Sequence, residues 1–203
     1  MTDTNLNRPK TLMELAGAPG WPTPAAGEAA VILIDAQQEY VTGALPLEGI
    51  DKALAEVSRL RERAKELGFP VIHVRHVGRP GGLFDIEAEG GKFCGVAEPT
   101  DGEIVVGKGL PNAFAGTDLQ ERLSGLGVRK LIVAGFMTHM CVSSTVRAAL
   151  DLGYSSAVVA NACTSRALPV PGGGTLSGAE VHRAALTALA DRFALVLEDA
   201  SAI

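Results

Sequence analysis

The sequence has few aromatic residues, no cluster of basic residues and no long apolar segment. Aromatic residues make up 4% of its 203 residues, although hydrophobic residues together make up 47%. This profile is typical of a folded α/β domain rich in Ala, Val and Leu, and it argues against disorder. The formal net charge is −5. Without a basic patch, we expect neither nucleic acid nor an acidic membrane surface as a partner. No apolar run reaches the roughly 20 residues of a transmembrane helix.

Cysteine is also scarce, with Cys94, Cys141 and Cys163 as the three examples. Their odd number and wide spacing do not suggest a disulfide framework. The N-terminal segment MTDTNLNRPK is polar and lacks the apolar core of a secretory signal. These features predict a protein of the reducing cytoplasm.

Glycine-rich phosphate-binding motifs are missing. The first predicted strand ends at Asp35 and is followed by Ala-Gln-Gln-Glu instead of G-x-G-x-x-G, so no pyrophosphate turn is available. The glycines at 172–174 lack the Lys-Ser/Thr pair of a P-loop. A nucleotide-binding module is therefore the weaker interpretation.

Strand and helix patterns alternate from residue 30 onward. Apolar runs predict buried strands, and apolar residues at helical spacing predict helices. The expected strands are 30–35, 71–75, 103–106, 130–135, 156–160 and 193–197, and the expected helices are 51–67, 117–126, one beginning at Cys141, and 177–191. This alternation predicts an α/β fold, a three-layer α/β/α sandwich with a six-stranded parallel, Rossmann-like sheet.

The remaining segments are irregular. Residues 1–28, rich in Pro, Gly and Ala, predict an N-terminal arm with one helical turn around Leu12–Leu15, and residues 29–203 predict a single domain. The connections 77–101 and 164–176 lack periodicity, and we expect them to form lids or binding walls.

Four residues predict where helices begin or end. We expect Asp51 to cap the first long helix and Gly68 to end it. Thr117 and Ser177 each precede an acidic or amide side chain by three residues, which predicts capping boxes.

Three reactive side chains are predicted at the carboxyl edge of the sheet. Asp35 ends the first strand, Lys108 follows the third, and Cys141 follows the fourth. Ligands of open parallel sheets bind at this edge. If the fourth strand lies beside the first, the three side chains share one crevice, where a thiol beside an acid and a cation suits nucleophilic catalysis. The start of a helix at Cys141 favours the thiolate through the helix dipole.

Each of these residues also has a simpler structural interpretation. Asp35 can cap a turn, Lys108 can be solvated, and Cys141 can be a small buried hydrophobe. Their joint placement at one edge favours the functional interpretation.

The motifs around these residues resemble a known family. The segments VILIDAQQEY, VGKGLPNAFAGTDL and VAGFMTHMCVSSTVRAALDLGY occur in that order, and together the sequence resembles the isochorismatase-like cysteine hydrolase superfamily, which includes nicotinamidases and N-carbamoylsarcosine amidohydrolases. The likeness covers most of residues 30–193 and implies that 29–203 is an isochorismatase-like hydrolase domain.

The resemblance implies a catalytic triad of Asp35, Lys108 and Cys141. It also implies a cis peptide bond between Phe136 and Met137, with the backbone N–H groups of Met137 and Cys141 binding the substrate oxyanion. The implied reaction is cysteine-dependent hydrolysis of an amide or carbamoyl C–N bond through a thioester. The implied assembly is a homodimer or homotetramer, and we expect the apolar arm with Leu12 and Trp21 to pack between its subunits.

Two alternatives to C–N hydrolysis remain open. One is cleavage of a vinyl ether, as in true isochorismatases, some of which lack the cysteine; the presence of Cys141 therefore favours C–N hydrolysis. The other is a protein of the same fold without catalytic activity, either a binding protein or a thiol sensor. A thiol sensor would need a resolving cysteine nearby.

Residues near the triad in sequence are candidates for the substrate pocket: Gln37, Tyr40, Phe114, Thr138 and His139. Tyr40 and Phe114 are equally suited to the core. His139 can line the pocket or lie exposed on the first helical turn, because helix starts at catalytic edges are often partly open.

We expect no metal and no other cofactor. The nicotinamidase branch carries a metal-binding Asp-x-His that this sequence lacks. His73 and His76 form the one close histidine pair, and positions three apart on a strand point to opposite faces. We therefore expect one core histidine and one at the strand end.

Overall fold

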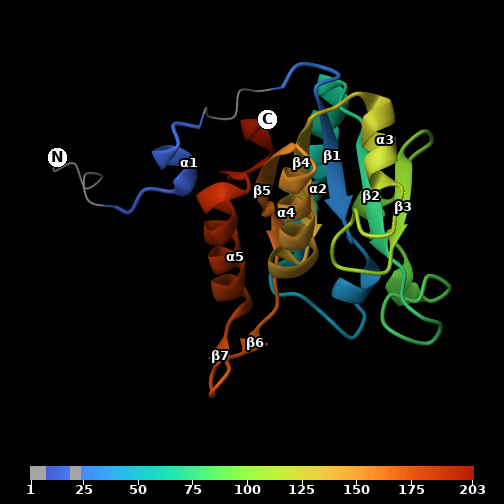
Figure 1. Cartoon of the computed structure of the whole chain (residues 1–203). Coiled ribbons are helices and arrows are strands. Elements are labelled where there is room, and N and C mark those ends of the chain that lie inside the picture. The colour runs from blue at the N-terminus through green and yellow to red at the C-terminus, as the bar shows by residue number, and fades with distance from the viewer. Residues whose placement is uncertain (1–7, 19–23) are drawn as a thin grey trace.

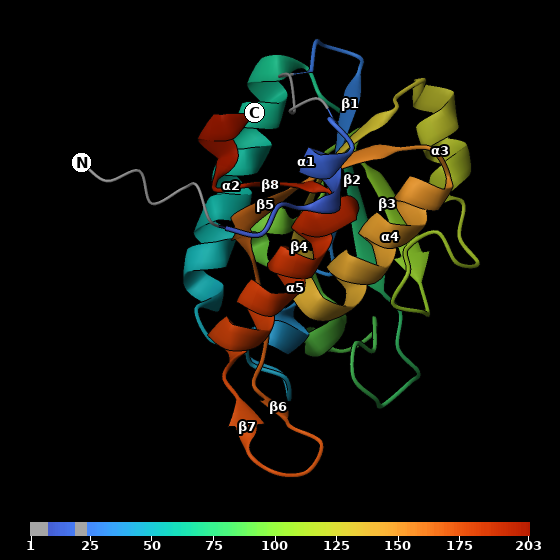
Figure 2. The same cartoon turned by 60° about the vertical axis from the view of Figure 1, so that its left-hand side comes forward.

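The computed structural model describes residues 8–18 and 24–203. The expected helical turn of the arm is present as α1 (Leu12–Leu15), capped by Thr11 and Glu14. The backbone N–H of Leu12 donates to Asp191 Oδ1 at 2.8 Å, which joins α1 to helix α5 (Figure 2). Trp21, which we expected to contribute to subunit packing, lies outside the described residues.

Six parallel strands form one sheet, as the sequence predicts (Figure 1). In chain order the main elements are β1 (Ala29–Ile34), α2 (Ile50–Leu67), β2 (Val71–His76), β3 (Ile104–Lys108), α3 (Leu119–Leu126), β4 (Lys130–Phe136), α4 (Ser143–Asp151), β5 (Ser155–Thr164), α5 (Gly178–Arg192) and β8 (Leu195–Leu197). The strand order is β3-β2-β1-β4-β5-β8. The fourth strand therefore does lie beside the first.

Alternate side chains of β1 enter the two layers that cover the sheet. Val31 and Leu33 pack in an apolar cluster with α2, whereas Ile32 and Ile34 pack in a second cluster with α3, α4 and α5. Every residue of β1 is buried. This explains its uninterrupted apolar sequence, because a central parallel strand is covered on both faces.

The helix ends match two of the four expectations. Gly68 ends α2 with φ of +70°, and Ser177 forms its capping box with Glu180. Asp51 is not the cap of α2, because the helix begins one residue earlier and Gly49 takes the capping position. Thr117 forms no capping box either. Its hydroxyl donates to the carbonyl of Ala113 and accepts from the backbone N–H of Leu119. Asp118, which takes the capping position of α3, makes no side-chain cap bond.

Several strands extend beyond their predicted ends. β3 continues through Lys108, and β5 continues to Thr164. Part of the connection predicted as irregular forms a small antiparallel hairpin of β6 (Leu168–Pro169) and β7 (Thr175–Leu176), which projects from the body of the protein (Figures 1 and 2). Among the helices described, none is long and apolar enough to cross a membrane.

Candidate active site

Four neighbouring strands bring polar side chains to the carboxyl edge of the sheet. Asp35 directly follows β1, His76 is the last residue of β2, and Lys108 is the last residue of β3. Cys141 lies in a short π-helical turn, η4 (Thr138–Val142), between β4 and α4. Because parallel strands end at a common edge, residues about 30 to 100 positions apart meet there.

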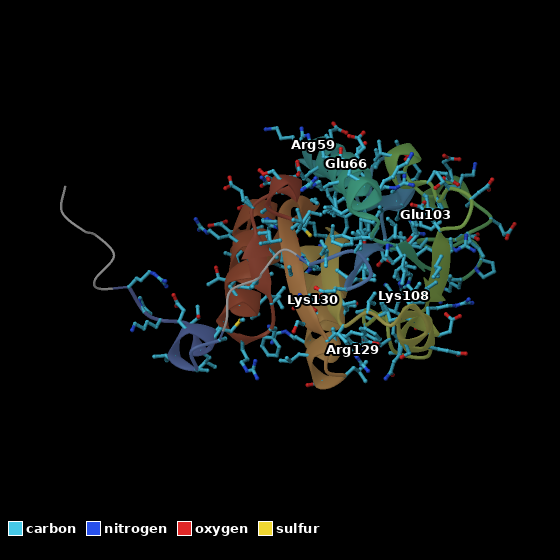
Figure 3. The ribbon with its side chains drawn as sticks, turned by 90° about the horizontal axis from the view of Figure 1, so that it is seen from above. Arg59, Glu66, Glu103, Lys108, Arg129 and Lys130 are labelled. Carbon is cyan, nitrogen blue, oxygen red and sulfur yellow. The ribbon has the colours of Figure 1, made fainter. Side chains whose placement is uncertain are left out.

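The ammonium group of Lys108 is the centre of this cluster. Its Nζ lies 2.7 Å from Asp35 Oδ2, 3.3 Å from His76 Nδ1 and 3.4 Å from Cys141 Sγ. An ammonium group has three protons to donate, so it has one proton for each of these three neighbours. Lys108 is 1% exposed and lies inside the molecule, whereas Arg59 extends from α2 at the surface (Figure 3).

The backbone at the end of β1 has an unusual conformation at Asp35 and a close approach to β4. Asp35 has φ of +51°, in the left-handed region that few residues other than glycine adopt. On the neighbouring strand β4, Gly135 has φ of +114°, and a Cβ placed there would lie 2.0 Å from the carbonyl oxygen of Ile34. Glycine is therefore required at 135, and its close approach sets β4 directly against the segment that carries Asp35.

The thiol of Cys141 is protonated in this site, contrary to our expectation from the helix start. Burial, and then the neighbouring Asp35 carboxylate, raises the pKa of Cys141 to about 12, although Lys108 acts in the opposite direction. Cys141 is 5% exposed and precedes the first residue of α4 by two positions. Desolvation penalises the thiolate more strongly than Lys108 stabilises it.

Asp35 can take the thiol proton. Its side chain is fully buried, and this desolvation raises its pKa above the ordinary value for Asp, while Lys108 lowers it. A carboxylate whose proton affinity is increased, yet whose charge is compensated by a lysine, is suited to accept a proton and return it.

The backbone before Cys141 has the feature implied by the family resemblance. The Phe136–Met137 peptide bond is cis. The N–H groups of Met140 and Val142 both donate to the carbonyl oxygen of Met137, at 3.0 and 3.3 Å. These bonds fix the turn that carries Cys141.

Gln37 and Tyr40 lie close to the cluster but are fully or almost fully buried. Gln37 uses its side-chain amide to bind the backbone of His76 and the carbonyl of Gly91. Tyr40 packs edge-to-face on Phe84 and Phe136. The structure therefore gives both residues a supporting position behind the site.

Thr138 is buried and forms hydrogen bonds that hold the turn carrying Cys141. Its hydroxyl lies 3.0 Å from the carbonyl oxygen of Thr164 and 2.7 Å from His182 Nδ1 of α5. The hydroxyl can donate to the carbonyl and accept from the imidazole, which ties turn η4 to β5 and to α5.

His139 and Phe114 are placed differently from the other candidates. His139 Nδ1 lies 3.1 Å from Ser165 Oγ, and its Nε2 is buried without a partner. Burial lowers the pKa of His139, with a smaller contribution from Arg166. Phe114 stacks on Tyr154 at 5.9 Å and packs against the core beneath α3 and α4. Of the two interpretations of Phe114, the core position is the one observed.

His76 is the residue that sequence reasoning missed. We had interpreted it as a strand-end histidine, and it does end β2, but its imidazole contacts Lys108. His76 also lines a hollow of about 880 Å³ formed with Glu39 and the segment 78–90. The sequence places His76 and Lys108 near the ends of two strands, but their pairing depends on the register of β2 and β3.

The two histidines of β2 have different side-chain partners and do not form a pair. His73 is buried and its Nε2 lies 3.0 Å from Glu103 Oε2, at the other end of β3 from Lys108. Within residues 8–18 and 24–203, no group of three or more His, Cys, Asp or Glu side chains is arranged to hold a metal ion.

Comparisons with known proteins identify the family. A family model for the isochorismatase domain matches residues 29–201. The isochorismatase family protein YddQ of Bacillus subtilis is 34% identical over 170 residues, which are 82% of this chain and 94% of that protein. Maleamate amidohydrolase of Pseudomonas putida is 29% identical over 147 residues, 64% of this chain and 69% of that protein.

Solved structures show the same relationship. The crystal structure of an isochorismatase from Pseudomonas putida KT2440 is 42% identical to this chain. The two superpose with a TM-score of 0.90, over 97% of this chain and 100% of the other. The chain therefore belongs to the isochorismatase family of hydrolases.

Proposed function

We propose that this hydrolase cleaves a C–N bond, of the amide or carbamoyl type, in a small molecule through a thioester on Cys141. The observation that carries the proposal is the convergence of Cys141 and Asp35 on one lysine, with Sγ at 3.4 Å and Oδ2 at 2.7 Å from Lys108 Nζ. A nucleophile, a proton acceptor and a fixed positive charge are the groups that acyl transfer requires. A relative named for the hydrolysis of an amide supports the same reaction class.

In the first half of the reaction, Asp35 accepts the proton of the Cys141 thiol as Sγ attacks the carbonyl carbon. Because the pKa of the resting thiol is about 12, proton transfer accompanies attack and does not precede substrate binding. Lys108 stabilises the negative charge on both partners. The backbone N–H groups of Met137 and Cys141 bind the oxyanion, and each such donor contributes about 3 kcal/mol to transition-state stabilisation.

In the second half, the C–N bond breaks as Asp35 returns its proton to the leaving nitrogen, and the acyl group remains on Cys141 as a thioester. Asp35 then removes a proton from a water molecule that attacks the thioester carbon. The C–S bond breaks, the carboxylic acid product leaves, and Asp35 returns the proton taken from water to the Cys141 sulfur. Asp35 acts twice as base and twice as acid in one cycle, which suits a carboxylate with a raised pKa.

The proposal is tested by an ammonia-release screen over primary amides, ureido acids and carbamoyl compounds. Cys141→Ala is expected to abolish release. Cys94→Ala, which changes another buried cysteine, is the matched control and is expected to retain activity. Intact-mass measurement with a substrate found in the screen is expected to show an acyl adduct on the wild type. Equal turnover by the wild type and Cys141→Ala would rule out the nucleophile.

Further measurements on the same two proteins distinguish the alternatives. Turnover of isochorismate without ammonia release, and unchanged by Cys141→Ala, would favour vinyl-ether hydrolysis. Binding of a screened compound without turnover would favour a binding protein. A disulfide between Cys141 and a second cysteine under mild oxidation would favour a thiol sensor.

We further propose that the protein works as a homodimer or homotetramer in a reducing, cytoplasmic environment. The arm helix α1 leaves Leu12 and Leu15 more than half exposed, at 52% and 67%, and three free, buried cysteines suit a reducing compartment.

A further inference from the structure

His76 and Lys108 form a cross-strand pair at the carboxyl edge of the sheet. They are direct register partners on the parallel strands β2 and β3. His76 Nδ1 lies 3.3 Å from Lys108 Nζ. The imidazole is therefore the hydrogen-bond acceptor for the ammonium proton that faces neither Asp35 nor Cys141.

This contact defines the protonation state of the imidazole. A charged lysine only donates hydrogen bonds, so His76 Nδ1 must accept, and the ring proton is on Nε2. Burial, and then the charge of Lys108, lowers the pKa of His76. The neutral ring that can accept is therefore the form present near neutral pH.

The position of His76 is fixed from the other side by Gln37. The side-chain amide of Gln37 accepts from the backbone N–H of His76 at 2.8 Å and donates to its carbonyl at 3.0 Å. Gln37 also donates to the carbonyl of Gly91 at 2.8 Å. The ring of His76 lies 5.1 Å from that of Phe84. With both backbone groups bonded and the ring packed against Phe84, the imidazole is held in place as an acceptor.

We propose that His76 is a positioning residue of this hydrolase, which accepts the third proton of Lys108 and so holds the ammonium group between Asp35 and Cys141. The inference rests on the proposed function of the triad. Without this acceptor, one ammonium proton is left unpaired in a buried site, and Lys108 gains freedom to rotate away from Sγ. Protonation of His76 has the same effect, because an imidazolium ring accepts no bond and repels the ammonium.

Other charged groups surround His76. Lys108 and Asp35 face it from the sheet, while Glu39, Arg79 and Glu89 share the hollow that it lines. The acid limb of the activity profile therefore contains two protonations in the cluster itself, those of His76 and Asp35. Replacing His76 by a residue that keeps an acceptor but cannot titrate removes the His76 protonation from the acid limb and leaves that of Asp35.

The experiment compares His76→Gln, which retains an acceptor oxygen, with His76→Leu, which does not. The first readout needs no substrate: the rate at which iodoacetamide alkylates Cys141, followed by peptide mapping between pH 6 and 9. We expect about a tenfold slower alkylation in His76→Leu, the effect of one lost charge-assisted hydrogen bond, and a rate within about threefold of wild type in His76→Gln. Equal rates in the wild type and His76→Leu would overturn the proposal.

The second readout is the hydrolysis of a substrate from the ammonia screen as a function of pH. We expect His76→Leu to lower kcat with little change in KM. In His76→Gln the acid limb of log kcat/KM is expected to fall with a slope near one instead of two. An unchanged acid limb in His76→Gln would contradict the role of His76.

His73→Gln is the control, because His73 lies on the same strand but contacts Glu103 and not Lys108. It is expected to leave both the alkylation rate and the acid limb unchanged. If His76→Leu does not fold, the comparison of His76→Gln with the wild type still decides the question. A failure of the proposed function would be seen separately, as normal Cys141 alkylation without hydrolysis of any compound.

Discussion

Removing the charge of Lys108 tests the buried cluster most directly. In Lys108→Met the side chain keeps its length and apolar stem but loses the ammonium that lies 2.7 Å from Asp35 Oδ2. Asp35 is 0% exposed and Lys108 1% exposed, so the remaining carboxylate is desolvated and has lost its counter-ion. Removal of one partner of a buried ion pair costs about 3–5 kcal/mol. We therefore expect a loss of about 4 kcal/mol and, in a chain of this size, a Tm lower by roughly 8–16 °C.

The assay is urea denaturation of four proteins: the wild type, Lys108→Met, Asp35→Asn and the double variant. Each single variant leaves one buried charge unpaired, whereas the double variant leaves none. The double variant is therefore expected to be clearly more stable than the sum of the single effects predicts. Lys92→Met removes a lysine that is 61% exposed in its ion pair with Glu89 and is expected to leave the denaturation midpoint unchanged.

Additive effects of Asp35→Asn and Lys108→Met, within about 0.5 kcal/mol, would refute the coupling of the two residues. A loss below about 1 kcal/mol in Lys108→Met would show that water reaches the site, and the argument from burial would fail.

Three further predictions concern stability and assembly. Burial lowers the pKa of all four histidines in the folded protein, so the unfolded chain binds more protons than the folded protein below about pH 6.5. The urea midpoint is therefore expected to fall as the pH is lowered from about 6.5. A flat midpoint down to about pH 5 would contradict this. Gly135→Ala is expected to cost at least about 2 kcal/mol because of the 2.0 Å approach to the carbonyl oxygen of Ile34, whereas Gly125→Ala, with open space around it, is expected to be neutral or stabilising by up to about 1 kcal/mol. Light scattering is expected to give two or four times the chain mass of 21.0 kDa, and a monomeric mass would rule out the proposed assembly.

The convergence of Asp35, Lys108 and Cys141 could be predicted because it follows from topology alone. Each residue comes at or just after the end of a strand, and parallel strands end at one edge. The alternation of strands and helices supplied that topology. The exact strand ends could not be predicted, since β3 and β5 extend further than their apolar patterns.

The protonation state of Cys141 could not be predicted from sequence. A helix start after a strand indicates a favourable dipole, but the cost of burial depends on the depth of the sulfur, and depth is set by packing from several elements. The same limit applied to His76. Its partner became visible only when the register of β2 and β3 was known.

Helix caps show a local version of this limit. Thr117 and Ser177 have the same sequence pattern, yet only Ser177 forms the box. The hydroxyl of Thr117 reaches back to Ala113 instead, because the preceding loop offers a carbonyl at hydrogen-bonding distance. The capping-box pattern of four residues does not include Ala113, so it cannot reveal this competing acceptor.

The segment that forms the hollow beside His76 continues into residues that are hydrogen-bonded to the backbone immediately after Asp35. Cys94 N donates to the carbonyl of Ala36 and Gln38 N to that of Lys92, at 2.8 and 2.9 Å. Residues 79–83 of that segment are exposed, whereas Phe84 is buried and packs against Tyr40 and His76. Insertions or deletions among the exposed residues would therefore reshape the wall of the hollow and leave the backbone after Asp35 in place.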